Sequence, residues 1–219
     1  MCKKCEDCQD DCPKGRASTT KDAKNIKVRV GYGWQKFYGD ESQRKGKDVL
    51  YDTFWQSLKN LFKPTCDGFK DSKDGHGISV SLGRLRASHG RFVWPTIEKR
   101  ITEADVLIFD VAAAPSKDIS GKSGELKQYI KQLNANVLLE IGYALGCGKR
   151  VFLMCPKHLF SQVPSDLSSF LWTLYVGRIK EGHLERTLVD SSGTINAFRG
   201  MLREIADAKS GKNDDGSDD

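Results

Sequence analysis

NVLLEIGYALGCGKRVFLM, residues 136–154, decides the fold class, because it predicts a helix that is followed at once by a strand. At about 100° per residue, one face of this helix gathers five apolar residues, Val137, Leu138, Ile141, Ala144 and Leu145. Leu139 and Tyr143 lie four residues apart and form a second apolar strip beside that face. We therefore expect a helix that is apolar on nearly all sides and is buried.

The residues at both ends of this segment fit the same interpretation. Asn134 or Asn136 can cap the start of the helix, and Gly146 and Gly148 can end it. The apolar run at residues 151–154 then predicts a strand that is covered on both faces, as strands of a parallel sheet are.

Glu140 interrupts the apolar surface of the predicted helix. A glutamate is rarely buried in a protein unless a partner satisfies its charge. Two alternatives follow from its position. Glu140 is either a solvated or ion-paired residue of an ordinary α/β helix, or a functional carboxylate that faces a cleft.

The composition indicates one soluble domain with tails. The chain has 219 residues, of which 38% are hydrophobic and 29% are charged, as is usual for globular proteins. No apolar run approaches the roughly 18 residues of a membrane helix, and the N-terminus has no apolar signal region. Seven cysteines without such a signal predict a cytoplasmic protein with free thiols. The net charge of +6 permits anionic ligands such as nucleotides and does not by itself imply nucleic acid.

Strand and helix patterns alternate along the chain. We predict strands at residues 26–30, 78–82, 105–111, 151–154 and 171–176, and helices at residues 49–62, 95–103, 125–133, 136–146 and 195–206, with a further helix beginning at residues 164–167. Pro64 is expected to end the first helix, before a loop at residues 65–77. This alternation predicts an α/β fold with a doubly wound parallel sheet. Residues 1–24 are expected to form a cysteine-rich arm, residues 25–208 the domain, and residues 209–219 a disordered tail.

Three features are expected to meet at the carboxyl ends of the strands, where open parallel sheets bind their ligands. The first is the turn after the first strand, formed by Gly31, Tyr32, Gly33 and Trp34, which offers close backbone approach and aromatic faces. The second is Asp110, at the end of the central strand. The third is the helix start near Asn136, whose free N–H groups favour phosphate. Two carboxylates that face one cleft suit chemistry at a glycosidic carbon, and a good leaving group such as nicotinamide hardly needs an acid.

Three segments carry a resemblance to a known family: residues 101–111 (ITEADVLIFDV), residues 136–154 and residues 164–167 (PSDL). They resemble the TIR-like nucleotide-binding proteins, which are similar to the nucleoside 2-deoxyribosyltransferases, and the resemblance spans roughly residues 25–180. In both groups a glutamate in an E-x-G-Y-A context is the catalytic carboxylate, and Glu140 stands at that position in EIGYA. The resemblance implies a flavodoxin-like sheet and cleavage or transfer at the N-glycosidic bond of NAD or a nucleoside, without a required cofactor. Many TIR-like proteins of this sort belong to bacterial antiviral defence and deplete NAD.

The sequence departs from both groups in two places. Asn136 and Val137 stand where the transferases tend to carry Gly-Thr, and the turn at residues 31–34 is not the usual TIR opening. These departures leave the substrate open more than the fold.

Three hypotheses for the function follow. The first is an N-glycosidase, in which Glu140 is the nucleophile or stabilises the oxocarbenium-like centre, Asp110 orients the ribose or assists a proton, and Tyr143 joins the residues that bind substrate. The second is a nucleotide-sensing or self-assembling TIR-like module without turnover. Under either hypothesis the expected partners are a nucleotide or nucleoside and a second copy of the chain in a homo-oligomer. The third is a phosphate-loop NTPase, suggested by SKDISGKS at residues 116–123. A serine stands there in place of the first glycine of that motif, which disfavours this hypothesis.

A cysteine cluster at the N-terminus predicts a separate metal site. Cys2, Cys5, Cys8 and Cys12, followed by Pro13, have the spacing of one cysteine run of bacterial ferredoxins, but no second run exists. The four thiolates suit a Zn ion or an iron–sulfur cluster, or they belong to an unliganded arm.

Overall fold

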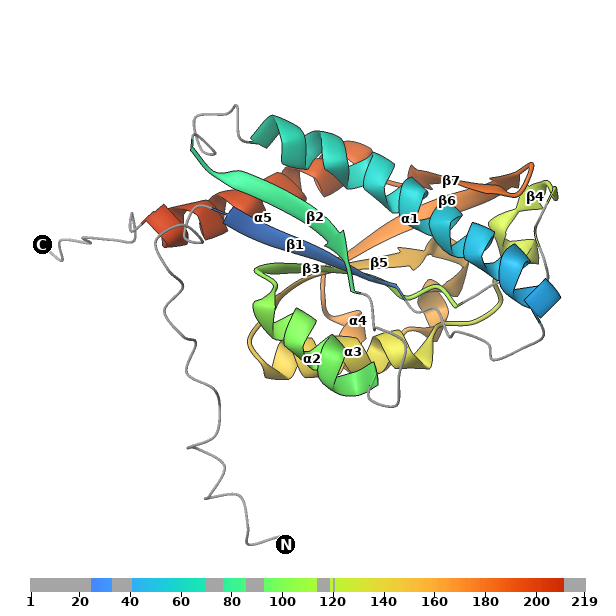
Figure 1. The fold of residues 1–219 in the computed structure, drawn as a ribbon, viewed down its shortest axis with the longest axis horizontal. Coiled ribbons are helices and arrows are strands. Elements are labelled where there is room, and N and C mark those ends of the chain that lie inside the picture. Colours follow the sequence, from blue (N-terminus) through green and yellow to red (C-terminus); the bar gives the residue numbers. More distant parts are fainter. Residues whose placement is uncertain are drawn as a thin grey trace, which may run out of the picture.

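The computed structural model describes residues 25–32, 41–69, 77–85, 93–113, 119 and 121–210, with side chains from Phe54 onward in the first helix. Its strands are β1 (Asn25–Tyr32), β2 (Ser79–Arg84), β3 (Val106–Asp110), β4 (Gly124–Glu125), β5 (Arg150–Pro156), β6 (Trp172–Lys180) and β7 (His183–Leu188). Its α-helices are α1 (Glu41–Phe69), α2 (Val93–Glu103), α3 (Ala135–Gly146), α4 (Ser165–Ser168) and α5 (Ser191–Ser210), and Leu126–Gln128 and Lys157–Gln162 form 3-10 helices (Figure 1).

The strands form one mostly parallel sheet in the order β2-β1-β3-β5-β6-β4, with β7 paired to β6. The pairs β1–β2, β1–β3, β3–β5 and β5–β6 are parallel, whereas β4 and β7 run antiparallel to β6. From β1 the chain moves outward to β2 and then crosses to β3 on the other side. The carboxyl ends of β1 and β3 therefore flank the point at which the strand order reverses.

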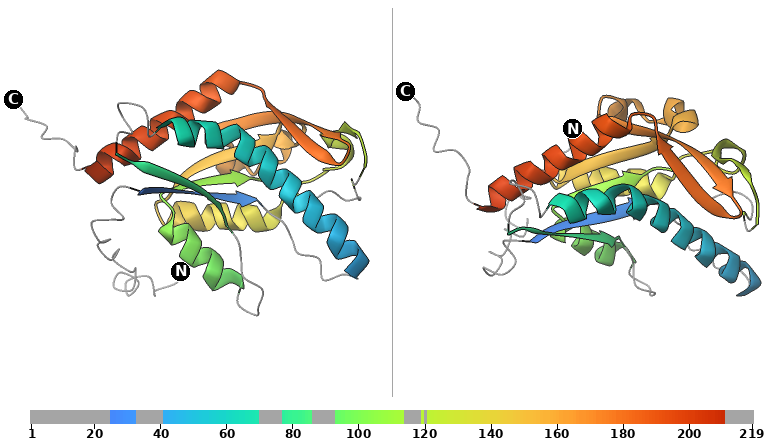
Figure 2. Two further views of the ribbon diagram at one scale, coloured as in Figure 1. Left: turned by 45° about the horizontal axis from the view of Figure 1, so that its top comes forward. Right: turned by 90° about the horizontal axis from the view of Figure 1, so that it is seen from above.

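Helices cover both faces of the sheet. Figure 2 shows α1 and α5 on one face and α2 and α3 on the other. The sheet curls into a half-barrel, and α1 lies along its concave side, where it contacts β2 near one edge and β7 near the other. Phe62 of α1 and Phe198 of α5 meet Phe152 of β5 edge-on and fill this layer. The predicted α/β class, with a mostly parallel sheet flanked by helices, is confirmed.

The central strand is buried along its whole length. All five residues of β3 are buried, as a run without polar alternation predicts for a strand with helices on both faces. In β1, Ile26, Val28 and Val30 are buried on the face toward α1 and α5, whereas Lys27 and Arg29 between them are half-buried. No helix in the described ranges is long and apolar enough to cross a membrane.

The prediction that Pro64 ends the first helix is wrong. Helix α1 continues through Pro64 to Phe69, although proline removes one backbone hydrogen bond and crowds the preceding turn. Cys66 and Phe69 beyond the proline are each only 2% exposed. Burial of these two side chains offsets the local loss, because a fully buried phenylalanine contributes about 1.5–3 kcal/mol.

Two further elements differ from the sequence predictions. The helix expected at residues 125–133 is replaced by the short strand β4 and a 3-10 turn. The strand expected to be the last one, β6, is followed by β7 across a two-residue turn. Glu181 and Gly182 in that turn have φ values of 51° and 81°, as a type I′ hairpin requires. The alternation of apolar Leu184 and Leu188 with polar neighbours was a signal for β7.

Helix α3 has one buried face. Asn134 caps it, and Gly148 follows its end with a φ of 64°. Val137, Ile141 and Ala144 are fully buried, but Leu139 is 61% exposed. The expectation that α3 is buried on nearly all sides is therefore wrong, because its second apolar strip divides between the α2 interface and the solvent.

Candidate active site

Glu140 has no partner for its charge in the described part of the chain. Its side chain is half-buried on α3, and it forms no hydrogen bond or ion pair with any described residue. Burial raises the pKa of the Glu140 carboxyl from its ordinary 4.5 to about 7. The first alternative for Glu140 was a solvated or ion-paired residue of an ordinary helix. The described residues show neither an ion pair nor a fully solvated Glu140 side chain.

One flank of α3 carries Glu140 and reaches α2 through the ring of Tyr143. Helical spacing places Asn136 and Tyr143 on the same flank, one turn to either side of Glu140. Tyr143 packs edge-on against Trp94 of α2, with the ring centroids 5.5 Å apart. The start of α3 is joined to the end of β3, because the Asn134 amide donates to the Val111 carbonyl at 2.8 Å. Glu140 thus lies on a helix that begins at the carboxyl end of the central strand.

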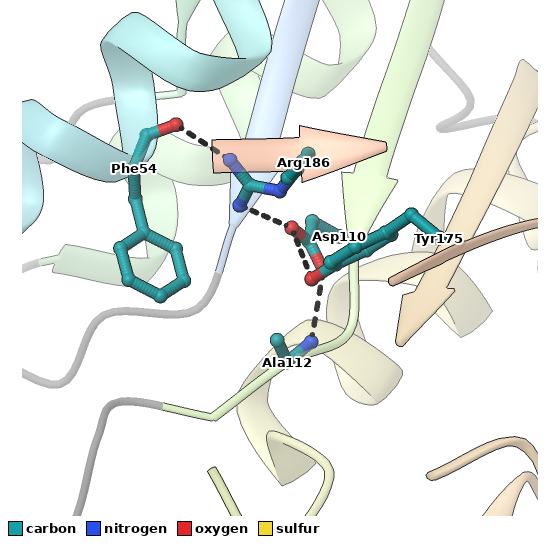
Figure 3. Close-up of polar contacts among 5 residues, drawn as sticks. All are labelled: Phe54, Asp110, Ala112, Tyr175 and Arg186. Atoms are coloured by element: carbon teal, nitrogen blue, oxygen red, sulfur yellow. Dashed lines mark hydrogen bonds and ion pairs between the residues drawn. The ribbon is translucent and has the colours of Figure 1, made fainter. Parts of the chain in front are cut away.

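Asp110 lies on the other face of the sheet (Figure 3). It is 1% exposed, and its carboxylate accepts hydrogen bonds from the Ala112 amide at 3.1 Å, from the Tyr175 hydroxyl at 3.0 Å and from Nη2 of Arg186 at 2.7 Å. In the pairing of β3 with β5, Asp110 lies beside Met154, which is two residues after Phe152 and therefore on the same face of the sheet. Phe152 packs against Phe62 of α1, so this is the face that is covered by α1 and α5. The expectation that Asp110 and Glu140 face one cleft is wrong, because the pleat of β3 directs Asp110 away from α3.

Arg186 is held as firmly as the carboxylate that it pairs with. Its side chain has no exposed surface, and Nη1 donates to the Phe54 carbonyl of α1 at 3.1 Å. The guanidinium also lies 4.9 Å from the centre of the Phe54 ring and 5.1 Å from that of Tyr175, in cation–π range. Burial and the neighbouring Asp110 raise the pKa of Tyr175 well above its ordinary value, so its hydroxyl stays protonated and donates.

Gly31 serves the packing of the sheet. A Cβ atom at this position would lie 2.5 Å from Cε1 of Phe109 and 2.8 Å from Cδ1 of Leu85, closer than real Cβ contacts. The two side chains occupy the space that we expected to admit a ligand, so the prediction of close ligand approach at Gly31 is wrong. The Tyr32 side chain, Gly33 and Trp34 lie outside the described residues.

The N-terminal turn of α3 is already capped. The side-chain oxygen of Asn134 accepts from the amides of Asn136 at 2.9 Å and Val137 at 3.4 Å. These two N–H groups are therefore not available to a phosphate, which corrects the expectation for the helix start near Asn136. The Asn136 side chain itself is exposed.

The two other predicted sites fall mostly outside the described part of the chain. Cys2, Cys5, Cys8 and Cys12 are not described, and among the described residues no cluster of potential metal ligands occurs. Of the segment at residues 116–123, only residues 119 and 121–123 are described, and the short strand β4 follows them. A phosphate loop leads directly into an α-helix, so this context weakens the NTPase hypothesis further.

The buried Asp110–Arg186 pair predicts a large loss of stability on Asp110→Asn. Removal of one member of a buried ion pair leaves the other charge uncompensated, which costs about 3–5 kcal/mol. Urea unfolding measures the difference, with Glu204→Gln as the control, because Glu204 pairs with Arg150 at the surface and should contribute less than about 1 kcal/mol. In the double variant Asp110→Asn/Arg186→Met, the second change should cost much less than it does alone. Equal effects of Asp110→Asn and Glu204→Gln would contradict this role.

Gly31→Ala should destabilise the fold by about 1–3 kcal/mol, because the added methyl group forces Phe109 and Leu85 apart. Gly200→Ala is the matched control, since a Cβ atom there meets nothing within 4 Å in α5. That change should stabilise the protein by about 0.5–1 kcal/mol. Thermal unfolding distinguishes the two variants, and a neutral Gly31→Ala would show that Phe109 and Leu85 move aside at little cost, contrary to a tightly packed site.

Glu140→Gln should stabilise the protein at alkaline pH. The folded pKa of about 7 lies above the ordinary 4.5, so ionisation reduces the stability of the folded state as pH rises from 4.5 through 7. At pH 8 the variant should be more stable than the wild type by about 1–3 kcal/mol, and at pH 4 the difference should vanish. Unfolding curves at both values measure this, with Glu204→Gln again as control. Destabilisation by Glu140→Gln would reveal a structural ion pair instead.

Comparison of the sequence with protein-family models gives no match, and no curated protein matches it significantly.

Proposed function

We propose that this protein cleaves the N-glycosidic bond of NAD or a related nucleotide, by hydrolysis or by transfer, with Glu140 as the catalytic carboxylate. The observation that carries the proposal is Glu140, which is half-buried, has no ion pair or hydrogen bond with any described residue, and lies on a helix that starts at the carboxyl end of the central strand. An ionised carboxylate that is partly buried without a counter-charge reduces the stability of the folded state, and residues with such perturbed pKa values are often found at functional sites. The position of Glu140 in EIGYA matches that of the catalytic glutamate in the TIR-like proteins and the deoxyribosyltransferases.

The proposed fold is a doubly wound, flavodoxin-like sheet of the TIR-like kind. Numbered along the chain, the five parallel strands β2, β1, β3, β5 and β6 have the order 2-1-3-4-5, which is the flavodoxin-like order. In that arrangement ligands bind beyond the carboxyl ends of the strands beside the reversal point, and α3 begins there. A role in bacterial antiviral defence, through loss of cytoplasmic NAD, accords with this proposal.

The single carboxylate on α3 favours NAD over an ordinary nucleoside. When the C1′–N bond of NAD breaks, the positively charged nicotinamide ring takes the bonding electrons and leaves as a neutral molecule, without a proton. Glu140 then needs only to attack or stabilise the positive charge at C1′, and water or another nucleophile completes the reaction. A neutral nucleoside requires an acid for its base, and Asp110, the second carboxylate that we expected, is held on the other face of the sheet.

The test is incubation of the purified full chain with NAD, and separately with a deoxynucleoside plus a free base, with chromatography of the products. We expect nicotinamide release from NAD, and at least about a 100-fold loss in Glu140→Gln, comparable to the loss of a main electrostatic stabiliser. Glu204→Gln should retain the wild-type rate. Equal rates of Glu140→Gln and wild type would show that Glu140 is not the catalytic carboxylate. Base exchange in place of NAD cleavage would instead assign a transferase, and NAD binding without turnover a sensing module.

The pH profile tests the ionised form of Glu140. Because the attacking or stabilising group is the carboxylate, kcat/KM for NAD should rise with pH through an inflection near 7, the pKa of the free enzyme. A rate that falls above pH 7 would mean that Glu140 acts as a proton donor.

A further inference from the structure

Trp94 has a fixed orientation at the start of α2. Its indole Nε1 donates to Oε1 of Glu98, one turn further along α2, at 2.7 Å. The side chain is half-buried and lies edge-on against Tyr143, 5.5 Å between ring centroids. The hydrogen bond and the ring contact together hold the indole in the interface between α2 and α3.

Glu140 lies one helical turn before Tyr143. Residues that are three apart in a helix have Cβ atoms about 5–6 Å apart and lie on the same flank. Of the other residues one turn away, Asn136 is exposed, and Val137 and Ala144 are small and face the core. Tyr143 is thus the only large ring beside Glu140 on α3, and Trp94 extends that apolar surface onto α2.

We propose that Trp94 and Tyr143 act as a positioning pair, whose rings keep water away from the Glu140 carboxylate one turn before Tyr143. The use of this pair in catalysis rests on the proposed function, whereas the exclusion of water does not. The pair explains how a carboxylate on a surface helix is desolvated, with no partner of opposite charge among the described residues.

The charged groups nearby do not supply another explanation. α3 has no other charged residue. The elements packed around it carry Glu98, Lys99, Arg100 and Glu103 on α2, Lys27 and Arg29 on β1, Asp110 on β3, and Arg150 on β5. Glu98 bonds Trp94, Lys99 pairs with Glu103, and Asp110 and Arg150 pair with Arg186 and Glu204. Burial is the cause of the raised pKa of Glu140, without a contribution from these charges.

The experiment is an NMR titration of the full chain labelled with ¹³C at the glutamate carboxyl, with the Glu140 signal assigned by its absence from Glu140→Gln. In the wild type, the Glu140 carboxyl should titrate near pH 7. In Trp94→Ala the midpoint should fall by about one pH unit or more, because water reaches the carboxylate. Trp94→Phe keeps a ring and should largely retain the wild-type midpoint. Trp172→Ala is the matched control. Trp172 begins β6 and is half-buried against Phe160 of the 3-10 helix Lys157–Gln162, so its replacement should leave the Glu140 midpoint unchanged.

An unchanged Glu140 midpoint in folded Trp94→Ala overturns the proposal, as does an equal fall in Trp172→Ala. If Trp94→Ala does not fold, Tyr143→Leu tests the same pair, with Tyr143→Phe as its conservative partner. The titration is independent of turnover. A wild-type protein that neither cleaves NAD nor exchanges bases, but has the expected midpoints, refutes the proposed function alone. Cleavage with an unchanged midpoint in Trp94→Ala refutes the positioning pair alone.

Discussion

The ion pair between Asp110 and Arg186 is the interaction on which the rest of the structure depends. It joins the end of the central strand β3 to the edge strand β7, and Arg186 also bonds the Phe54 carbonyl of α1. Burial of two charges is expensive, and only good geometry with further hydrogen bonds offsets it. The bonds from Tyr175 and Ala112 provide that geometry. Arg186 thereby ties β7 to both α1 and β3, and these elements lie together on the concave side of the half-barrel.

The same pair limits the chemistry that the other face can perform. A carboxylate that accepts from an arginine, a tyrosine and a backbone amide has no free oxygen for a substrate, and it points toward α1. Glu140 is therefore the one carboxylate on α3 that the proposed reaction can use. A reaction that needs one anion and no acid fits this division better than one that needs two carboxylates, and this is why we place NAD ahead of neutral nucleosides.

The parts of the fold that could be predicted are those with local patterns. The buried strand β3 is a continuous apolar run, and the capped helix α3 repeats its apolar residues with helical spacing, so the existence of both followed from the sequence. The pairing of Asp110 could not be predicted, because Arg186 is 76 residues away and lies on β7, a strand that we did not expect. Without β7, Asp110 looked like an unpaired carboxylate at a strand end. The continuation of α1 through Pro64 depends in the same way on distant packing of Phe69.

Glu140 differs from Asp110 in what its surroundings supply. Asp110 receives three donors, one of which is the counter-charge of Arg186, as a structural carboxylate needs. Glu140 is half-buried and has no ion pair or hydrogen bond with any described residue. A helix with this capping and packing has no structural need of a glutamate there, since an uncharged side chain would avoid the desolvation. The arrangement does suit a carboxylate that must be reactive, because an anion that is poorly solvated before the reaction gains most when positive charge develops beside it. The poor solvation that makes Glu140 unfavourable for stability is thus the property that the proposed reaction requires.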